Sequence, residues 1–286
     1  MKGFLLVILL CIFLTLGIYI TSVISLSDKS LRIIFCDVGQ GDAIYVRTPS
    51  GIDMLIDGGP DEKVLSCLSR HMPFWDRSID MVFVSHPHAD HFVGLLSVLE
   101  RYKVGMFLRE DLVNNTEAYS VLSREVSSQK IKEKVLWRGD KIRFPDGVTV
   151  SVLGPTKSYI DITSPDKKIN SSEFASMILK VSFGEFDGVF TGDTQLRQFR
   201  EDFKESGRYK VEVLQIPHHG SKTGVDIELL REIKPSIAVV SVGKNSYGLP
   251  NKQVLEMLSQ MKIKTLRTDV VGDIAIVSDG RKLEVR

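Results

Sequence analysis

The sequence contains few cysteines and carries almost no net charge. The first property excludes metal sites built from cysteine, and the second excludes capture of nucleic acid by the overall charge of the protein. Its three cysteines, Cys11, Cys36 and Cys67, form no CxxC pair, so a cysteine-ligated metal site is excluded. The 37 Lys and Arg residues against 36 Asp and Glu leave a formal net charge of +1. The charge of the whole molecule therefore cannot capture nucleic acid, and any polyanion must be held by a local patch or by metal. Repeats and low-complexity tracts are lacking too, and a hydrophobic fraction of 43% is ordinary for a globular protein with a sizeable core.

Cys36 and Cys67 are expected to be buried free thiols. Cys36 follows the apolar run LRIIF, which is typical of the end of a buried strand. A disulfide between these two cysteines is the alternative, and the sequence does not decide the redox compartment.

One long apolar run is present, at the N-terminus. No charged residue occurs from Gly3 to Ile24, and about 20 such residues are enough to span a bilayer as a helix. Cleaved signal peptides have shorter apolar cores of about 7–15 residues and a small-residue cleavage site, and no A-x-A pattern follows this run. We therefore expect a membrane anchor and linker in residues 1–28 and a soluble domain in residues 29–286, on the outer face of the cell membrane. A cleaved signal is the alternative.

Short apolar runs and helical patterns alternate through the rest of the chain. This order predicts a single α/β or α+β domain. The expected strands cover residues 31–35, 43–47, 53–57, 81–85, 148–153, 176–183, 188–191, 211–216, 237–242, 274–278 and 282–285. The expected helices cover residues 62–70, 92–102, 195–206, 226–233 and 251–261.

The segment SHPHADHFVG, residues 85–94, has the composition of a metal site. It places His86, His88, Asp90 and His91 within six positions, directly after a predicted buried strand. A turn at a strand end can bring alternate side chains together, and imidazole with carboxylate suits zinc, manganese or iron. This density of histidine is hard to explain by a structural role alone.

Three further segments place polar side chains after apolar strands, where loops build sites on a rigid scaffold. LIDGG ends in Asp57 and two glycines, VFTGD ends in Asp193, and QIPHHGS contains His218 and His219. Each alone is weak evidence, because Asp before Gly is common in turns. His71 lies in no such setting and is expected to be structural.

These motifs resemble the metallo-β-lactamase-fold hydrolases. FCDVGQGDA (35–43), IPHHGSKTG (216–224), SVGKNSYGLP (241–250) and RTDVVGDI (267–274) narrow the resemblance to the extracellular hydrolase domain of the ComEC-type DNA-uptake channel protein. The resemblance implies a four-layer αββα sandwich with the site at one edge. It also implies two divalent metal ions, zinc or manganese.

The resemblance also implies a role for each residue of the site. His86 and His88 would hold the first metal, while Asp90, His91 and His219, favoured over His218, would hold the second. Asp193 would bridge both metals, and Asp57 would orient the histidines. As a mechanistic hypothesis, Asp90 would also orient the nucleophile, and His218 or a metal-bound water would protonate the leaving group. Ser221 and Lys222 would hold a phosphate, with an ordinary polar loop as the alternative. Asn245 would face the substrate, and Asp37, Gln40 and Asp42 would brace the floor of the site.

The chain departs from this family at two points. No histidine lies between His91 and His218, although many members of the fold have a further histidine ligand there. Asn170 or Glu173 is the nearest candidate substitute. Leu249 stands where relatives often have the histidine of a GHP motif.

The resemblance favours a metal-dependent phosphodiesterase, most plausibly a nuclease acting on DNA or RNA outside the membrane. A chain with one anchor cannot itself be the channel, so a separate uptake-channel protein is an expected partner. The alternatives are a hydrolase of a cell-envelope phosphodiester of the phosphocholine or teichoate type, a β-lactam or thioester hydrolase, and a non-catalytic subunit that presents DNA.

Overall fold

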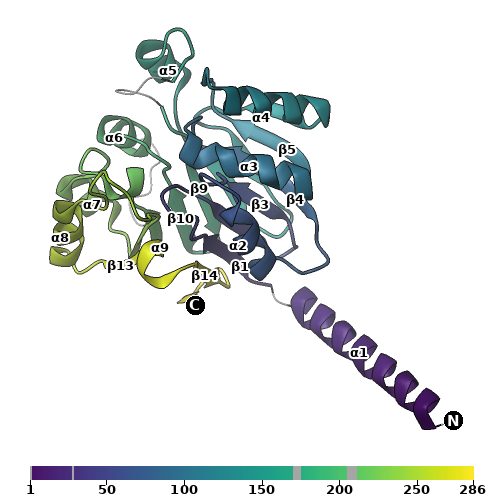
Figure 1. Ribbon diagram of the computed structural model, residues 1–286. Helices are drawn as coiled ribbons and strands as arrows, with labels where there is room; N and C mark the ends of the chain where they lie inside the picture. The colour runs from purple at the N-terminus through teal and green to yellow at the C-terminus, as the bar shows by residue number, and fades with distance from the viewer. Residues whose placement is uncertain (1, 28, 170–174, 205–210) are drawn as a thin grey trace.

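Two β-sheets stacked face to face form the body of the protein (Figure 1). The structure is a computed structural model that describes residues 2–27, 29–169, 175–204 and 211–286. Within these residues the first sheet has eight strands, in the order β15-β14-β1-β2-β3-β4-β5-β6, and the second has seven, in the order β13-β12-β11-β10-β9-β8-β7. The chain is thus a mixed α/β two-sheet sandwich, in agreement with the predicted fold class.

The strands of each sheet divide into an antiparallel part and a parallel part. In the first sheet, β3, β4, β5 and β6 run parallel, and in the second so do β10, β11, β12 and β13. The first sheet consists of β1 (Leu31–Phe35), β2 (Ile44–Arg47), β3 (Asp53–Ile56), β4 (Ser78–Val84), β5 (Lys103–Arg109), β6 (Lys132–Val135), β14 (Ile274–Ser278) and β15 (Leu283–Val285). The second consists of β7 (Lys141–Arg143), β8 (Thr149–Gly154), β9 (Ile178–Phe183), β10 (Phe186–Phe190), β11 (Val213–Gln215), β12 (Ile237–Val240) and β13 (Lys264–Arg267).

Helices cover the outer face of each sheet. Buried side chains of α2 (Lys63–His71), α3 (Ala89–Arg101) and α4 (Glu117–Ser128) form one apolar cluster with the first sheet. Those of α6 (Leu196–Lys204), α7 (Ile227–Ile233) and α8 (Lys252–Gln260) form another with the second sheet. The remaining helices are α5 (Lys157–Thr163), α9 (Thr268–Val271) and the 3-10 turn η1 (His218–Gly220).

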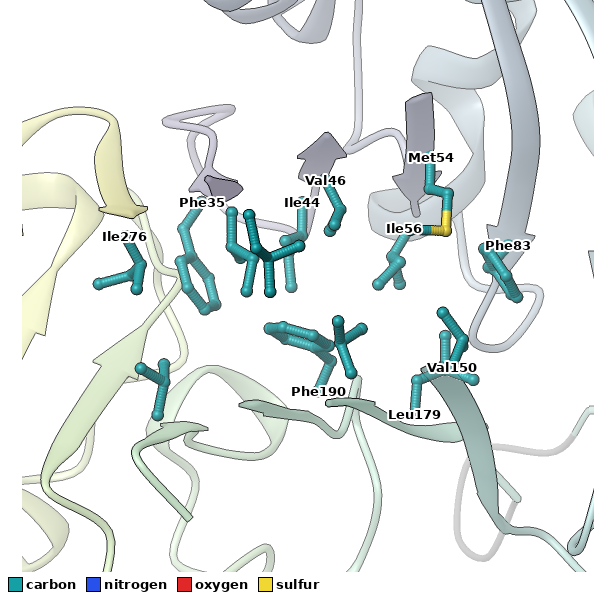
Figure 2. Packing of buried hydrophobic residues seen from close by; sticks show 14 of the residues in the cluster. Phe35, Ile44, Val46, Met54, Ile56, Phe83, Val150, Leu179, Phe190 and Ile276 are labelled. Atoms are coloured by element: carbon teal, nitrogen blue, oxygen red, sulfur yellow. The ribbon is translucent and has the colours of Figure 1, made fainter. Parts of the chain in front are cut away.

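The main core lies between the two sheets. Figure 2 shows side chains of both sheets pointing toward one another, with Phe35 and Ile56 on one side and Leu179 and Phe190 on the other. The rings of Phe35 and Phe190 meet across the interface with their centroids 5.8 Å apart. Because the first sheet is covered by helices on its other face, its central strands are buried on both sides and read as continuous apolar runs.

The elements with strong periodicity were predicted within a few residues of their bounds. Seven elements were not predicted: β5, α4, β6, β7, α5, β13 and α9. β6, for example, has the sequence KEKV and is largely exposed at the edge of its sheet. Edge strands of this kind lack the apolar alternation by which a strand is recognised.

α1 (Lys2–Ser27) is the N-terminal helix and extends away from the sandwich (Figure 1). Its described side chains, Phe4 and residues 6–17, are exposed. Among the described residues, no helix combines the length and the apolar character needed to cross a membrane. The structure therefore does not support the predicted transmembrane span.

The expectation of two free thiols is wrong. Cys36, at the end of β1, and Cys67, in α2, form a disulfide with Cα atoms 5.7 Å apart. Both residues are fully buried between α2 and the first sheet. Packing of the helix against the strand brings the two side chains together, and spacing in the sequence gives no sign of it.

Candidate metal centre

The predicted site residues gather at the carboxyl ends of parallel strands. Asp57 follows β3, His86 follows β4, Asp193 follows β10 and His219 follows β11. Strands of both sheets end at this edge, so loops from the two halves of the sandwich meet there. The carboxyl ends of parallel strands are the usual place for ligand sites in such sheets.

The first cluster consists of His86, His88 and Asp193. His86 Nε2 lies 2.9 Å from His88 Nδ1 and 3.8 Å from Asp193 Oδ2. His86 and Asp193 are buried, whereas His88 is partly exposed, so the cluster opens toward solvent on the His88 side. Two imidazoles and one carboxylate, with an open position, match the ligand number of catalytic zinc sites.

The second cluster consists of Asp90, His91, Asp193 and His219. Asp90 and His91 lie in the first turn of α3, which begins directly after the His86–His88 turn. His219 Nε2 lies 3.3 Å from Asp90 Oδ2 and 3.5 Å from Asp193 Oδ1, and His91 Nε2 lies 3.4 Å from Asp193 Oδ1. Asp193 is thus the residue that the two clusters share.

Gly192 allows the Asp193 carboxylate to reach this position. It has φ of +49°, and a Cβ there would lie 2.5 Å from Ser176 Oγ and 2.7 Å from Ser85 Oγ. A side chain at residue 192 would therefore push the Asp193 loop away from β4, so the turn needs glycine both for its backbone conformation and for its close packing.

The turn after β11 separates the roles of the two adjacent histidines. His218 and His219 have φ of 51° and 53°, a left-handed conformation that L-residues adopt at a cost and that is common at functional sites. His219 is buried in the second cluster, and its Nδ1 lies 2.9 Å from the carbonyl oxygen of Ser241. The side chain of His218 is 32% exposed, with Nε2 3.6 Å from Asp193 Oδ2. His219 thus belongs to the cluster and His218 stands at its mouth.

Asp57 fixes the orientation of His91. Its carboxylate accepts hydrogen bonds from Ser85 N at 2.7 Å and Ser85 Oγ at 2.6 Å, and it lies 2.9 Å from His91 Nδ1. The Nε2 atom of His91 is therefore directed at Asp193. Asp42 lies below, 3.7 Å from His91 Nδ1 and 3.6 Å from His219 Nδ1.

Burial and neighbouring charges set the protonation of the cluster. Burial lowers the pKa of His86 well below its ordinary value, so its ring is neutral, the form in which imidazole binds metal. Burial also lowers the pKa of His91 and His219, but the negative charges of nearby carboxylates raise it by more. The largest of these contributions comes from Asp193. The carboxylates hold the pKa of His91 well above its usual range and raise that of His219 to about 9. Burial raises the pKa of Asp42 to about 6.

The donor atoms of this cluster fit divalent metal. His91 Nε2 and Asp193 Oδ1 are buried, have no hydrogen-bond partner and face each other at 3.4 Å. Buried polar atoms without partners are costly, and a cation held between them would satisfy both. Imidazole nitrogens and carboxylate oxygens are the ligands of zinc and manganese.

An open cavity of about 770 Å³ lies over both clusters. Of the predicted supporting residues, Gln40, Ser221 and Asn245 line it. Lys222 is exposed and is not among the lining residues. Asp37 is also exposed and lines a different cavity with Arg70 and Asp273, so it does not join the floor of the site.

Lys244 and Tyr247 are among the residues of the cavity wall that the prediction from sequence missed. Both lie in the segment SVGKNSYGLP, in which Asn245 was the only residue predicted to face the substrate. A lysine and a tyrosine three positions apart in a polar loop gave no specific signal in the sequence. Asn170 and Glu173, the proposed substitutes for the missing histidine, lie outside the described residues.

Replacing Asp57 by asparagine should lower the affinity for metal by about 10- to 100-fold, the range for residues that orient metal-binding histidines. Asparagine keeps the shape but presents an amide where Ser85 and His91 face a carboxylate. Competition with a chromophoric chelator measures the affinity, and thermal unfolding of the metal-free variant reports any loss of stability separately. Unchanged affinity would show that Asp57 has no orienting role.

The comparisons with known proteins agree with this geometry. Residues 53–224, which contain most of the clustered side chains, match the model of the Beta-lactamase superfamily domain. The chain is 28% identical over 263 residues to "ComE operon protein 3" of Bacillus subtilis (strain 168), an alignment covering 83% of this chain and 32% of that protein. It is also 27% identical over 242 residues to "Competence protein ComA" of Neisseria gonorrhoeae. This alignment covers 82% of this chain and 30% of that protein.

The solved structures include a protein of the same fold. The metallo-beta-lactamase fold protein YhfI from Bacillus subtilis aligns with a TM-score of 0.59 and 11% identity, over 87% of this chain and 100% of that one. This likeness concerns the fold alone. This chain spans only about a third of the length of the two competence-related relatives. It belongs to the β-lactamase superfamily, as a metallo-β-lactamase-fold domain that matches the hydrolase domain of ComEC-like competence proteins.

Proposed function

We propose that this metallo-β-lactamase superfamily hydrolase is a two-metal phosphodiesterase that cleaves DNA or RNA. The observation that carries the proposal is the pair of clusters that share Asp193 below an open cavity. His86, His88 and Asp193 would hold one divalent ion, and Asp90, His91, His219 and Asp193 the other. When bound, such a pair supplies Lewis-acid activation of water and neutralises charge that develops on a phosphoryl group.

The chain's own residues would then bind and orient the reactants. Asp90, 34% exposed at the edge of the second cluster, is placed to accept a proton from the attacking water and to orient it toward phosphorus. As the phosphorus–oxygen bond to the leaving group breaks, His218, at the cavity mouth, is placed to donate a proton to the departing oxygen. Ser221 lines the same cavity and can donate to a phosphate oxygen. Lys222 could reach a longer substrate from outside the cavity.

We also propose that the domain acts on the outer face of the cell membrane, in the uptake of DNA and beside a separate channel protein. The names of the relatives support competence as the setting. The Cys36–Cys67 disulfide supports an oxidising, extracytoplasmic compartment. The exposed apolar side chains of α1 support attachment of residues 1–28 to the bilayer.

A second candidate is a non-catalytic subunit that presents DNA. The observation in its favour is Leu249, which lines the cavity where relatives often have histidine. Metal analysis of the purified chain separates the candidates, since an enzyme of the proposed kind holds close to two metals per chain and a degenerate binder fewer than one.

The activity is tested by incubating the full chain with single-stranded DNA, double-stranded DNA, RNA and phosphocholine esters, with Mn²⁺ or Zn²⁺ and with a chelator. Metal-dependent consumption of nucleic acid is expected, with a loss of about 100-fold or more on His88→Ala, beyond the range for residues that only orient ligands. His71→Ala, a histidine outside the cavity paired with Asp273, is the matched control. Full metal-dependent activity in the His88 variant would refute the mechanism, and consumption of the esters alone would redirect the substrate assignment.

A further inference from the structure

One wall of the metal cavity has no part in the metal chemistry. It is formed by residues 244–249, which connect β12 to α8 and include Lys244, Tyr247 and Leu249. Tyr247 is 79% exposed, yet it lines the same cavity as His88, Asp193 and His218. A ligand that entered the cavity and covered this ring would be stabilised by the burial of its aromatic surface.

The side chain of Asn245 holds this wall in a fixed shape. Its Nδ2 donates to the carbonyl oxygens of Gly243 and Leu249, at 2.9 and 2.8 Å. Its Oδ1 accepts from the backbone N–H groups of Tyr247 and Leu249, at 3.0 and 3.1 Å. One amide thus makes four hydrogen bonds within the loop. Tyr247 is therefore presented on a preorganised loop, which lowers the entropy cost of binding against its ring.

The chemistry of the wall selects the kind of ligand. Lys244, exposed on the same loop, favours an anionic group near the ring and opposes a cationic head group such as choline. Aromatic rings bind nucleobases by stacking, and a cationic side chain beside them takes the phosphate. In a duplex the faces of the bases are already stacked on one another, so the ring can be used only by an unpaired base.

We propose that Tyr247 is a stacking platform for a nucleobase of single-stranded nucleic acid, with Lys244 binding the adjoining phosphate. This inference rests on the proposed phosphodiesterase function and names its substrate class. The base stacked on Tyr247 lies next to the phosphodiester over the metal clusters, so the platform sets which bond is presented for cleavage.

The test compares Tyr247→Ala with Tyr247→Phe in the full chain, using a short single-stranded oligodeoxynucleotide that contains 2-aminopurine. Stacking of one base contributes about 1–3 kcal/mol, so Tyr247→Ala should raise KM about 5- to 150-fold, with a smaller change in kcat. Tyr247→Phe keeps the ring and should stay within about twofold of the unsubstituted chain. Phe74→Ala, which removes an exposed ring outside the cavity, is the matched control and should leave KM unchanged.

An oligonucleotide with abasic sites gives the second arm. Removing the bases should raise KM in the unsubstituted chain, and the loss should not add to that of Tyr247→Ala, because both remove the same contact. If the two increases in KM were additive, or if Tyr247→Ala did not change KM, the proposal that Tyr247 stacks on a base would be overturned. The proposed phosphodiesterase activity would not be affected by either result.

Quenching of 2-aminopurine fluorescence on binding separates the two proposals. If no phosphodiester is cleaved but quenching is observed and is lost in Tyr247→Ala, the platform stands and the proposed catalysis fails. If the unsubstituted chain neither quenches the fluorescence nor cleaves the oligonucleotide, both are overturned.

Discussion

Replacing Asp193 by asparagine should abolish metal-dependent turnover and remove metal from the protein. Asp193 is the one carboxylate common to both clusters, with Oδ1 facing His91 and His219 and Oδ2 facing His86. Asparagine has nearly the same shape but no negative charge, and it turns one acceptor into an NH₂ donor. We expect kcat/KM to fall by well over 100-fold, beyond the range for residues that merely orient ligands. Metal content should fall from near two ions per chain to below one.

Asp187→Asn is the matched control for this variant. Asp187 is a fully buried carboxylate within β10, the strand that leads to Asp193, and it pairs with Lys180 and Ser182 away from the clusters. Its replacement should lower stability and leave the metal content intact. Two bound metals and full turnover in Asp193→Asn would show that the clusters do not share this residue as a ligand.

Removing the Cys36–Cys67 disulfide should give the largest change in stability. The bond closes a loop with a sequence separation of 31 residues. In the chain-entropy model, a loop of this length stabilises the fold by roughly 3–4 kcal/mol. The Cys36→Ala/Cys67→Ala double variant should therefore unfold about 7–15 °C below the unsubstituted chain, measured by circular dichroism.

The exposed free cysteine provides the control. Cys11→Ala leaves the disulfide intact and should keep the midpoint of unfolding. Because both bonded cysteines are buried, a reductant should act slowly on the folded protein and quickly in denaturant. Rapid reduction under native conditions, or an unchanged midpoint in the double variant, would contradict this account.

The sequence predicted the clustered side chains because the signal is local. His86, His88, Asp90 and His91 occupy one turn and the start of one helix, so their proximity needs no knowledge of distant contacts. The strand ends that carry Asp57, Asp193 and His219 were also recognisable, from apolar runs that end in glycine or proline. The sequence alone does not give the order of the parallel strands, so the expectation that these strand ends meet at one edge came from the family resemblance.

Residues whose position depends on tertiary contacts were assigned less well. Asp37 and Asp42 lie five positions apart, but the turns at Gly39 and Gly41, with φ of +80° and +146°, direct one to the surface and the other beneath His91. The pairing of Cys36 with Cys67 arises from the packing of α2 on the sheet. Tyr247 was missed because an exposed tyrosine in a polar loop looks ordinary until Asn245 is seen to fix its place.

The pairing of β1 with β14 bears on how the protein folds during synthesis. Leu31 to Phe35 pair with Ile274 to Ser278, so β1 obtains one of its two neighbours from a segment far later in the sequence. Until those residues emerge from the ribosome, one edge of β1 has unpaired backbone groups that could bind another chain. Because this long-range pairing must wait for β14, closure of the first sheet is expected to be a late step in folding.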